Sequence, residues 1–147
     1  MVYRIYVEKK PGLDQEARAL QNDARTFLGV QGLEKVRIFN RYDAENISEE
    51  LFALAVREVF SEPQLDNTFS VPDTEGASAV FAVEYLPGQF DQRADSAAQC
   101  IQIISRRERP RVASARVSGI SREASRASTG LITYFLISPI SSAAGAP

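Results

Sequence analysis

The fold is decided by the stretch Val2-Tyr-Arg-Ile-Tyr-Val-Glu8, which is followed by Pro11-Gly12. Successive side chains of a strand point to opposite faces, so Tyr3, Ile5 and Val7 share one face, and this alternation predicts a half-buried strand. After the Pro-Gly turn, apolar residues recur every three or four positions, which is typical of an amphipathic helix. These helical positions are Leu13, Ala17, Leu20, Ala24 and Phe27.

The following residues continue an alternating β-α order. Alternating apolar residues within 33–40 predict a second strand, and the polar residues 41–46 predict a loop. Asn46 and Glu49 match the capping-box pattern that begins many helices. The helix expected there ends before Pro63, because the residue before a proline disfavours helical backbone angles. Its apolar positions are Leu51, Ala55, Val56 and Val59.

The same order of features returns in the second half of the chain. A strand pattern at 80–86 is followed by Pro87-Gly88 and by a second run of helical spacing. The apolar positions of this second helix are Phe90, Ala94, Ala97, Ile101 and Ile104. The segment 61–79 between the halves is rich in turn-forming residues and shows neither a helical nor a strand period, which predicts a linker.

The residue numbers favour a duplication. The strand residues Ile5 and Phe81 are 76 apart, and the helical residues Leu13 and Phe90 are 77 apart. Val36 and Ile38 lie 79 before Ala115 and Val117, while Ala55, Val56 and Val59 lie 76 before Leu131, Ile132 and Phe135. Two-layer α/β proteins share such patterns, so a single match has little weight. Four elements in the same order at nearly constant spacing favour two copies of one unit.

The sequence therefore predicts an α+β fold with two like subdomains related by an approximate twofold axis. We expect the first subdomain at 1–63, a linker at 64–79, the second subdomain at 80–139 and a disordered tail at 140–147. Each unit is too small to bury its sheet alone, so the interface between the two is expected to form the main core. In the second half, Ser118-Gly-Ile-Ser121 is expected to cut the strand short, and a helix over 121–128 would be the least stable element.

Composition narrows the class of protein. The chain has 147 residues, with 44% hydrophobic and 24% charged residues, which fits a soluble globular protein of one or two small lobes. No run approaches the roughly 18 apolar residues of a membrane span, and the start of the chain lacks a signal-peptide pattern, so a cytoplasmic protein is expected. A single cysteine and the absence of histidine argue against a disulfide framework, a typical zinc site and the usual catalytic triads.

Charge is distributed unevenly along the chain. Residues 1–104 hold 10 Lys and Arg against 17 Asp and Glu, whereas residues 105–147 hold 7 Arg against 2 Glu. The basic segment either meets an acidic surface, its own or a partner's, or forms a solvated arm. The run Arg106–Arg111 has no interleaved aromatic residues and contains Pro110, so no nucleic-acid partner is predicted.

The densest polar segment is the candidate site. Within it, Gln92, Arg93, Ser96 and Gln99 recur at helical spacing and form a stripe suited to a polar interface, although a solvated helix face has the same pattern. Gly88 and Gln89 near the helix start offer a weak anion site. The carboxylates of Asp14 and Asp91 head equivalent helices and are best explained as helix caps. Cys100 beside the apolar face is expected to be a packed, inert thiol.

Four stretches resemble one known family in the same order. The strongest is Leu86-Pro-Gly-Gln-Phe-Asp-Gln-Arg-Ala-Asp-Ser-Ala-Ala-Gln-Cys-Ile-Gln102. The others are Tyr3-Arg-Ile-Tyr-Val-Glu-Lys-Lys-Pro-Gly12, Val36-Arg-Ile-Phe-Asn-Arg-Tyr-Asp43 and Phe60-Ser-Glu-Pro-Gln-Leu-Asp-Asn67. Together they resemble the N-terminal domain of the large, single-chain type of phosphoribosylformylglycinamidine synthase. The similarity covers about residues 1–117 and fades after Val117.

The resemblance implies a role in a larger enzyme. The family enzyme is a glutamine-dependent, ATP-consuming ligase of de novo purine synthesis that converts formylglycinamide ribonucleotide to its amidine. Its N-terminal domain resembles a fused dimer of the small separate synthase subunit, with two ferredoxin-like subdomains, and helps to couple the glutaminase and synthetase domains. Those two domains are the implied partners. ATP and magnesium are implied for the complete enzyme, but no catalytic, cofactor-binding or metal residue transfers to this chain.

Because of this resemblance, we interpret the polar stripe as a protein interface rather than as a solvated helix face. The residues it points to are Gln89, Asp91, Gln92, Arg93, Ser96 and Gln99. A second class of function stays open, a free-standing regulatory module that binds a small molecule between paired ferredoxin-like units. The isolated chain is expected to have no ATPase, glutaminase or ligase activity, because it lacks a histidine, a phosphate loop and an activated nucleophile.

Overall fold

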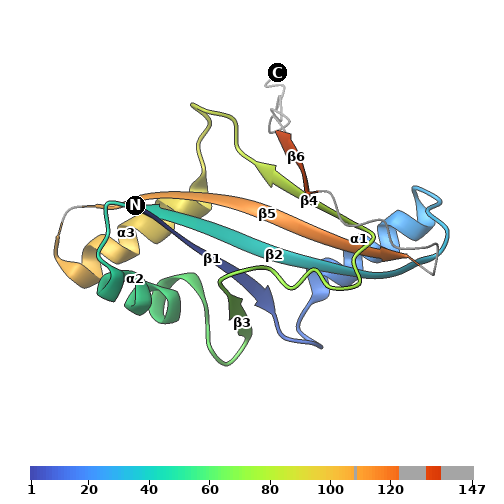
Figure 1. The fold of residues 1–147 in the computed structure, drawn as a ribbon, viewed down its shortest axis with the longest axis horizontal. Coiled ribbons are helices and arrows are strands. Elements are labelled where there is room, and N and C mark those ends of the chain that lie inside the picture. Colours follow the sequence, from blue (N-terminus) through green and yellow to red (C-terminus); the bar gives the residue numbers. More distant parts are fainter. Residues whose placement is uncertain (108, 123–131, 137–147) are drawn as a thin grey trace, which may run out of the picture.

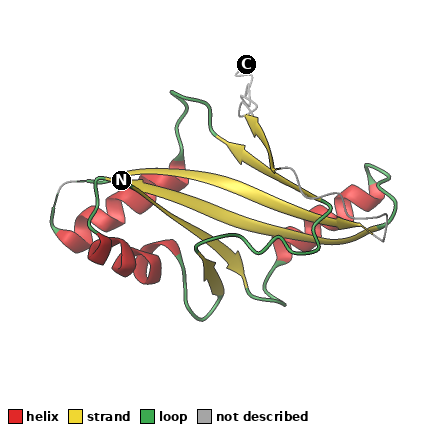
Figure 2. Cartoon of the chain, viewed as in Figure 1, coloured by secondary structure: helices red, strands yellow, loops and turns green. Residues whose placement is uncertain are grey.

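A computed structural model describes residues 1–107, 109–122 and 132–136 of the chain. Within these residues the fold is α+β, with one six-stranded sheet in the order β3-β1-β2-β5-β4-β6 and three α-helices (Figure 1, Figure 2). Neighbouring strands are antiparallel, except that β6 is parallel to β4. The elements are β1 Val2–Lys9, α1 Gln15–Thr26, β2 Leu33–Glu45, α2 Glu49–Ala55, the π-helical turn η1 Val56–Phe60, β3 Asp66–Phe69, β4 Ala79–Glu84, α3 Gln92–Ser105, β5 Arg111–Arg122 and β6 Ile132–Leu136.

Two strand pairs in the sheet have the same register. Ile5 of β1 lies opposite Tyr42 of β2, and Phe81 of β4 lies opposite Ser118 of β5. Five consecutive partner pairs of β1 and β2 map onto those of β4 and β5 at a constant offset of 76. The offset of 79 that equated Val36 with Ala115 is therefore wrong. Side chains alternate between the two faces of the sheet along a strand. The odd offset of 79 would therefore equate residues on opposite faces, whereas the even offset of 76 equates residues on the same face.

The three helices cover one face of the sheet. Near one end of β2, Val36 and Ile38 pack against Ala17 of α1. Near the other end, Tyr42 and Ala44 join a core made with α2, η1 and α3. The buried residues of that core are Ile5, Val7, Tyr42, Ala44, Ala55, Phe60, Ala97 and Ile101. The helices α1 and α3 therefore lie over opposite ends of the central strands β2 and β5 (Figure 1).

The opposite face of the sheet has its own small core. Its buried residues are Phe39, Val80, Ala82 and Val117. Ala77, from the connection between β3 and β4, packs against them. Arg37 fastens this connection to the sheet, because it donates two hydrogen bonds to Glu8, at 2.9 and 2.6 Å, and one to the carbonyl of Asp73 at 2.9 Å. The segment predicted to be a free linker is thus held in place.

Strand β2 continues through most of the loop predicted at 41–46, so that prediction is wrong. The charged residues there pair with one another instead of turning to solvent. Arg41 forms ion pairs with Asp43 at 3.2 Å and with Glu84, and Arg4 pairs with Asp43 at 2.5 Å. Polar composition indicated a loop, but ion pairs between strands neutralise these charges on the sheet surface.

The capping box predicted for α2 is also wrong. Ser48 is the N-cap of α2, and its hydroxyl accepts a hydrogen bond from the backbone N–H of Leu51 at 3.2 Å. Asn46 instead has a φ of 58°, a left-handed conformation that asparagine tolerates. It turns the chain between β2 and α2.

The second half departs from the predicted elements after α3. Strand β5 is not cut short at 118–121, because Ser118 and Gly119 lie in the middle of the sheet opposite Ile38 and Arg37. Ser118 is 2% exposed. A serine and a glycine are accommodated there because both neighbouring strands supply the hydrogen bonds of the ladder.

Two further elements differ from the sequence prediction. Residues 132–136 form strand β6 rather than the helix that the repeat equated with α2, and β3 lies inside the predicted linker 64–79. Ser121 and Arg122, at the start of the helix predicted at 121–128, belong to β5. The rest of that helix and the predicted tail 140–147 lie outside the described residues.

The α+β class expected from the sequence is confirmed. In the part of the chain that the structure describes, none of the helices is both long and apolar enough to cross a membrane.

Candidate docking surface on helix α3

Helix α3 carries most of the predicted site and is fixed at both ends. Asp91 is its N-cap, and the Asp91 carboxylate accepts a hydrogen bond from the backbone N–H of Ala94 at 2.9 Å. At the other end Arg106 adopts a left-handed conformation with a φ of 54°, and its backbone N–H bonds to the carbonyl of Gln102. Ala94, Ala97, Ala98 and Ile101 form the buried face of α3.

Two of the predicted interface residues have structural contacts. The carboxylate of Asp91 also accepts hydrogen bonds from the backbone N–H and the hydroxyl of Ser114 in β5, each at 2.8 Å. The side-chain oxygen of Gln89 accepts a hydrogen bond from the backbone N–H of Leu86 at 2.9 Å and closes the turn before the helix. Asp91 and Gln89 therefore hold the helix and its turn in place.

Three other predicted residues do lie on one exposed face. Gln92, Ser96 and Gln99 are exposed and are separated by four and three residues, so they point the same way from the helix. Cys100 and Ile103 are exposed beside them, and Ile103 is 74% exposed. We call these five residues the α3 outer face.

Cys100 was expected to be packed, and that prediction is wrong. On the helical wheel, Cys100 follows Ser96 by four residues and so turns toward the outer face rather than toward Ala97 and Ile101. Its thiol is free and exposed. Ile103 lies four residues after Gln99 and therefore faces the same way, but its apolar side chain did not belong to the predicted polar stripe.

Arg93 is also exposed, two helical turns before Cys100, and it lines a groove between α3 and α1. Burial lowers the pKa of the Arg93 guanidinium, whereas a hydrogen bond with the Tyr42 side chain and the negative charges of Glu16 and Asp91 raise it, and the net pKa lies above its ordinary value. The guanidinium is therefore a permanent cation facing the space between α3 and α1.

A groove of about 460 Å³ lies between α1 and α3 on the helical face of the sheet. Its walls combine apolar side chains with two cations. Arg93 and Arg116 line it, and Arg116 forms an ion pair with Glu16 at 2.5 Å. Leu20, Phe81, Val83 and Ser114 also line the groove. The groove offers an apolar surface beside positive charge.

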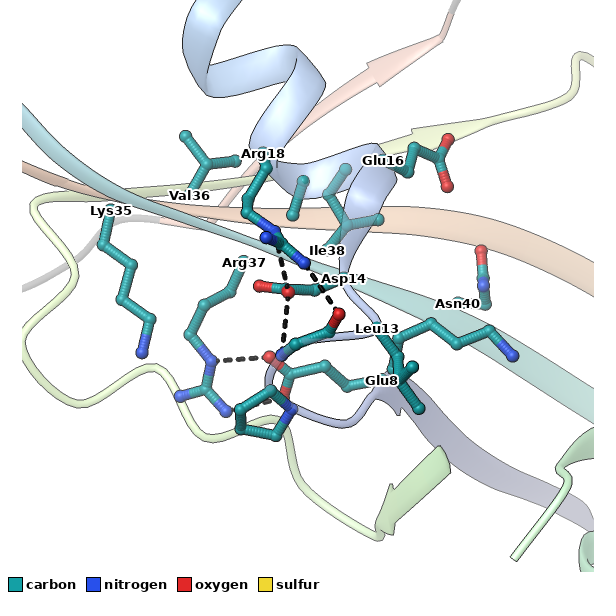
Figure 3. A pocket seen from close by; sticks show the side chains of 14 residues that line it. Glu8, Leu13, Asp14, Glu16, Arg18, Lys35, Val36, Arg37, Ile38 and Asn40 are labelled. Carbon is teal, nitrogen blue, oxygen red and sulfur yellow. Dashed lines mark hydrogen bonds and ion pairs between the residues drawn. The ribbon is translucent and has the colours of Figure 1, made fainter. Parts of the chain in front are cut away.

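A second pocket, also of about 460 Å³, lies where α1 begins beside β2 (Figure 3). Its charged side chains bind one another. Arg18 donates a hydrogen bond to the carbonyl of Gly12 at 2.8 Å and pairs with Asp14 at 3.2 Å, while Arg37 is engaged by Glu8. These internal pairs occupy Glu8, Asp14, Arg18 and Arg37 without a ligand.

The described residues contain no group of three or more His, Cys, Asp or Glu side chains placed to hold a metal ion. The comparisons with known proteins add no relative: no family model, no curated protein and no solved structure matches the chain.

Proposed function

We propose that this chain is a non-catalytic docking domain, the N-terminal domain of a phosphoribosylformylglycinamidine synthase, and that it couples the glutaminase and synthetase domains of that enzyme. In this proposal the domain consists of two ferredoxin-like units related by a pseudo-twofold axis and works in the cytoplasm. The ATP and magnesium of the complete enzyme are bound by the other domains. The sequence resemblance over residues 1–117 motivates the identification.

The sheet supports the duplicated architecture in this proposal. The order β3-β1-β2-β5-β4-β6 is symmetric for the inner strands when β1 and β2 are exchanged with β4 and β5. The edge strands differ, because β3 is antiparallel to β1 and β6 is parallel to β4. The partner residues of β1 and β2 also map onto those of β4 and β5 at an offset of 76, so these two inner strand pairs are equivalent. A domain built from two like units that share one sheet has two like outer surfaces, which suits a component placed between two partners.

The observation that carries the docking function is the composition of the α3 outer face. The buried alanines and Ile101 already attach the helix to the sheet, so the outer face is not needed for folding. It combines side-chain amides with the exposed Ile103 and Cys100. Apolar side chains surrounded by uncharged polar groups are typical of protein interfaces, whereas a solvated helix face is usually charged.

The test is a variant that blocks the face without disturbing the fold. Ser96→Arg places a long charged side chain at the centre of the outer face. We expect its affinity for the separately expressed glutaminase and synthetase portions of the enzyme to fall by about tenfold or more, with an unchanged melting temperature. The matched control is Asn22→Arg, an exposed position within α1. Equal affinities of wild type and Ser96→Arg for both portions would overturn the docking function.

A second candidate function, a regulatory module that binds a small molecule, is favoured by the groove between α1 and α3. Its volume lies within the usual range of ligand sites, about 300–1,000 Å³. Apolar walls from Phe81 and Val83 beside Arg93 suit a ligand with an apolar part and a negative charge. Calorimetric titration with amino acids and nucleotides tests this candidate, and binding that Arg93→Gln abolishes would favour it over docking.

A further inference from the structure

The groove between α1 and α3 lies over the midpoint of the inner strands β1, β2, β5 and β4. Asn40 of β2 and Arg116 of β5 are 76 residues apart and lie directly opposite each other, so the offset that equates the two inner strand pairs has its centre between them. Both residues line the groove. Helices α1 and α3, over opposite ends of these strands, contribute Leu20 and Arg93 to its walls (Figure 1).

Equivalent positions around this midpoint carry different charges. Asn40 has Arg116 as its counterpart in the sheet. A spacing of 77 equates Glu16 of α1 with Arg93 of α3. Glu16 forms its ion pair with Arg116, at 2.5 Å. Among the residues that the structure describes, Arg93 forms no ion pair, and its guanidinium shares a hydrogen bond with the Tyr42 side chain.

Two other acids beside the groove have partners of their own. Glu84 lines the groove and forms an ion pair with Arg41. Asp91 acts electrostatically on Arg93, but both oxygens of its carboxylate accept hydrogen bonds from Ser114. An anion that enters the groove therefore meets one guanidinium that no carboxylate pairs with directly.

Apolar side chains form the rest of the wall. Phe81 and Val83 of β4 lie on the helical face of the sheet and line the groove together with Leu20. Their counterparts at the offset of 76, Ile5 and Val7, are 8% and 4% exposed, because α2 and η1 pack over them. Phe81 and Val83 are half-buried, and Leu20 is exposed. The described residues thus leave open an apolar surface that in the first half of the chain belongs to the core.

We infer that this groove binds an aliphatic monocarboxylate. The Arg93 guanidinium receives the carboxylate, a pairing that planar guanidinium groups make with two parallel hydrogen bonds. The hydrocarbon chain lies against Leu20, Phe81 and Val83, where removal of its surface from water supplies affinity. This inference rests on the second candidate function, the regulatory module, and names the class of its ligand.

The charges around Arg93 favour a carboxylate over a phosphate. A phosphate monoester carries a charge of about −1.5 to −2 at pH 7, which is more than one unpaired guanidinium offsets. Phosphates also bind free N–H groups at helix N-termini, but at the start of α3 the Asp91 carboxylate already accepts from the backbone N–H of Ala94. The negative charge of Asp91 repels a dianion more strongly than a monoanion.

Calorimetric titration of the wild-type chain with matched probes separates the charge from the hydrocarbon chain. Octanoate has both, octanol has the chain without the charge, and acetate has the charge without the chain. We expect octanoate to bind at a single site and octanol and acetate to bind about tenfold more weakly or less. The methyl NMR signals of Leu20 and Val83 should shift with octanoate and so locate the site. Octanol that binds as tightly as octanoate would overturn the inference.

Variants test the two parts of the groove separately. Arg93→Gln should weaken octanoate binding by about tenfold or more and leave octanol binding unchanged. Leu20→Gln should weaken the binding of both probes. The matched control is Arg57→Gln, which removes an exposed arginine of η1 that does not line the groove. The melting temperature of each variant reports whether it is folded. Equal octanoate affinities of wild type and Arg93→Gln would contradict the assigned carboxylate site.

The same titrations distinguish failure of the ligand class from failure of the regulatory module. If octanoate does not bind but an amino acid or a nucleotide does, and Arg93→Gln abolishes that binding, the ligand class is wrong and the module stands. If none of these probes binds the wild-type chain, both fail. Docking at the α3 outer face is tested independently by Ser96→Arg.

Discussion

Asp91 connects helix α3 to strand β5 by binding Ser114, which lies 23 residues further along the chain. One oxygen of the Asp91 carboxylate accepts from the Ser114 backbone N–H at 2.8 Å and the other accepts from its hydroxyl at 2.8 Å, while the same carboxylate caps the helix at Ala94. Ser114 comes just before Ala115, the first residue of β5 that pairs with β4. The aspartate therefore occupies the place where a strand neighbour would bind.

Replacing Asp91 should be costly. Asp91→Ala removes the helix cap and leaves a buried N–H without its partner, so we expect the free energy of unfolding to fall by about 2–3 kcal/mol. Chemical denaturation measures this loss. The matched control is Asp14→Ala at the equivalent helix start. Asp14 was predicted to cap α1, but it makes no cap hydrogen bond there. Its carboxylate instead accepts from the backbone N–H of Gly12 at 3.2 Å and pairs with the exposed Arg18. We expect that control to lose about 0.5 kcal/mol, and equal losses would contradict the role given to Asp91.

The connection between β3 and β4 should loosen when Arg37 is removed. Arg37→Ala removes two hydrogen bonds to Glu8 and two to Asp73, so the backbone amides of 73–77 should exchange hydrogen faster. We expect a loss of about 1–2 kcal/mol in global stability, since Glu8 loses its charged partner. The exposed neighbour Lys35 supplies the control, Lys35→Ala. Unchanged exchange in 73–77 would show that Arg37 does not hold the connection.

The Asp73 carboxylate should become protonated at a lower pH than an ordinary aspartate. A hydrogen bond from Arg37, and then one from the backbone N–H of Glu75, hold the pKa of the Asp73 carboxyl below its usual value of about 3.9. A group with a lowered folded pKa stabilises the fold above the unfolded pKa, and this contribution is lost as the pH falls through the folded pKa. Carboxyl carbon NMR during an acid titration should show this low midpoint. In Arg37→Ala the midpoint should rise, and an identical midpoint would exclude the Arg37 contact as its cause.

Cys100 should react in the folded protein. Its side chain is exposed on the α3 outer face, so Ellman's reagent should titrate one thiol per chain without denaturant. The thiol also reports on docking, because a bound partner on the outer face should slow the reaction. A thiol that reacts after unfolding alone would mean that Cys100 is packed after all.

Local sequence patterns predicted the elements that form from neighbouring residues. The alternation in 2–8 predicted β1, and the Pro-Gly turns predicted where two helices follow their strands. The turn glycines Gly12 and Gly88 have φ values of 90° and 86°, a region that glycine enters without strain. Helical spacing also placed Ala94, Ala97 and Ile101 on the buried face of α3, as observed. Such signals are short in range, so they can be recognised along the chain.

The spacing of apolar residues predicted burial less well at the ends of a helix. Phe90 and Ile104 continue the apolar pattern of α3 but are 70% and 44% exposed, because they lie at the two ends of the helix, beyond the sheet residues that cover its centre. Among the candidate residues, the polar pattern correctly indicated the exposure of Gln92, Ser96 and Gln99. It could not show that Asp91 would reach Ser114, because that contact depends on the path of β5.

The sequence by itself indicated strand β1, the two helices that follow the Pro-Gly turns, and the exposure of Gln92, Ser96 and Gln99, because each depends on side chains a few positions apart. The tertiary structure alone decided that the two halves share one sheet, that β5 continues through Ser118 and Gly119, and that polar residues of β2 lie within a strand. Those outcomes depend on hydrogen bonds and ion pairs with β1, β4 and β5, and partners so far apart in the chain leave no local pattern in the sequence.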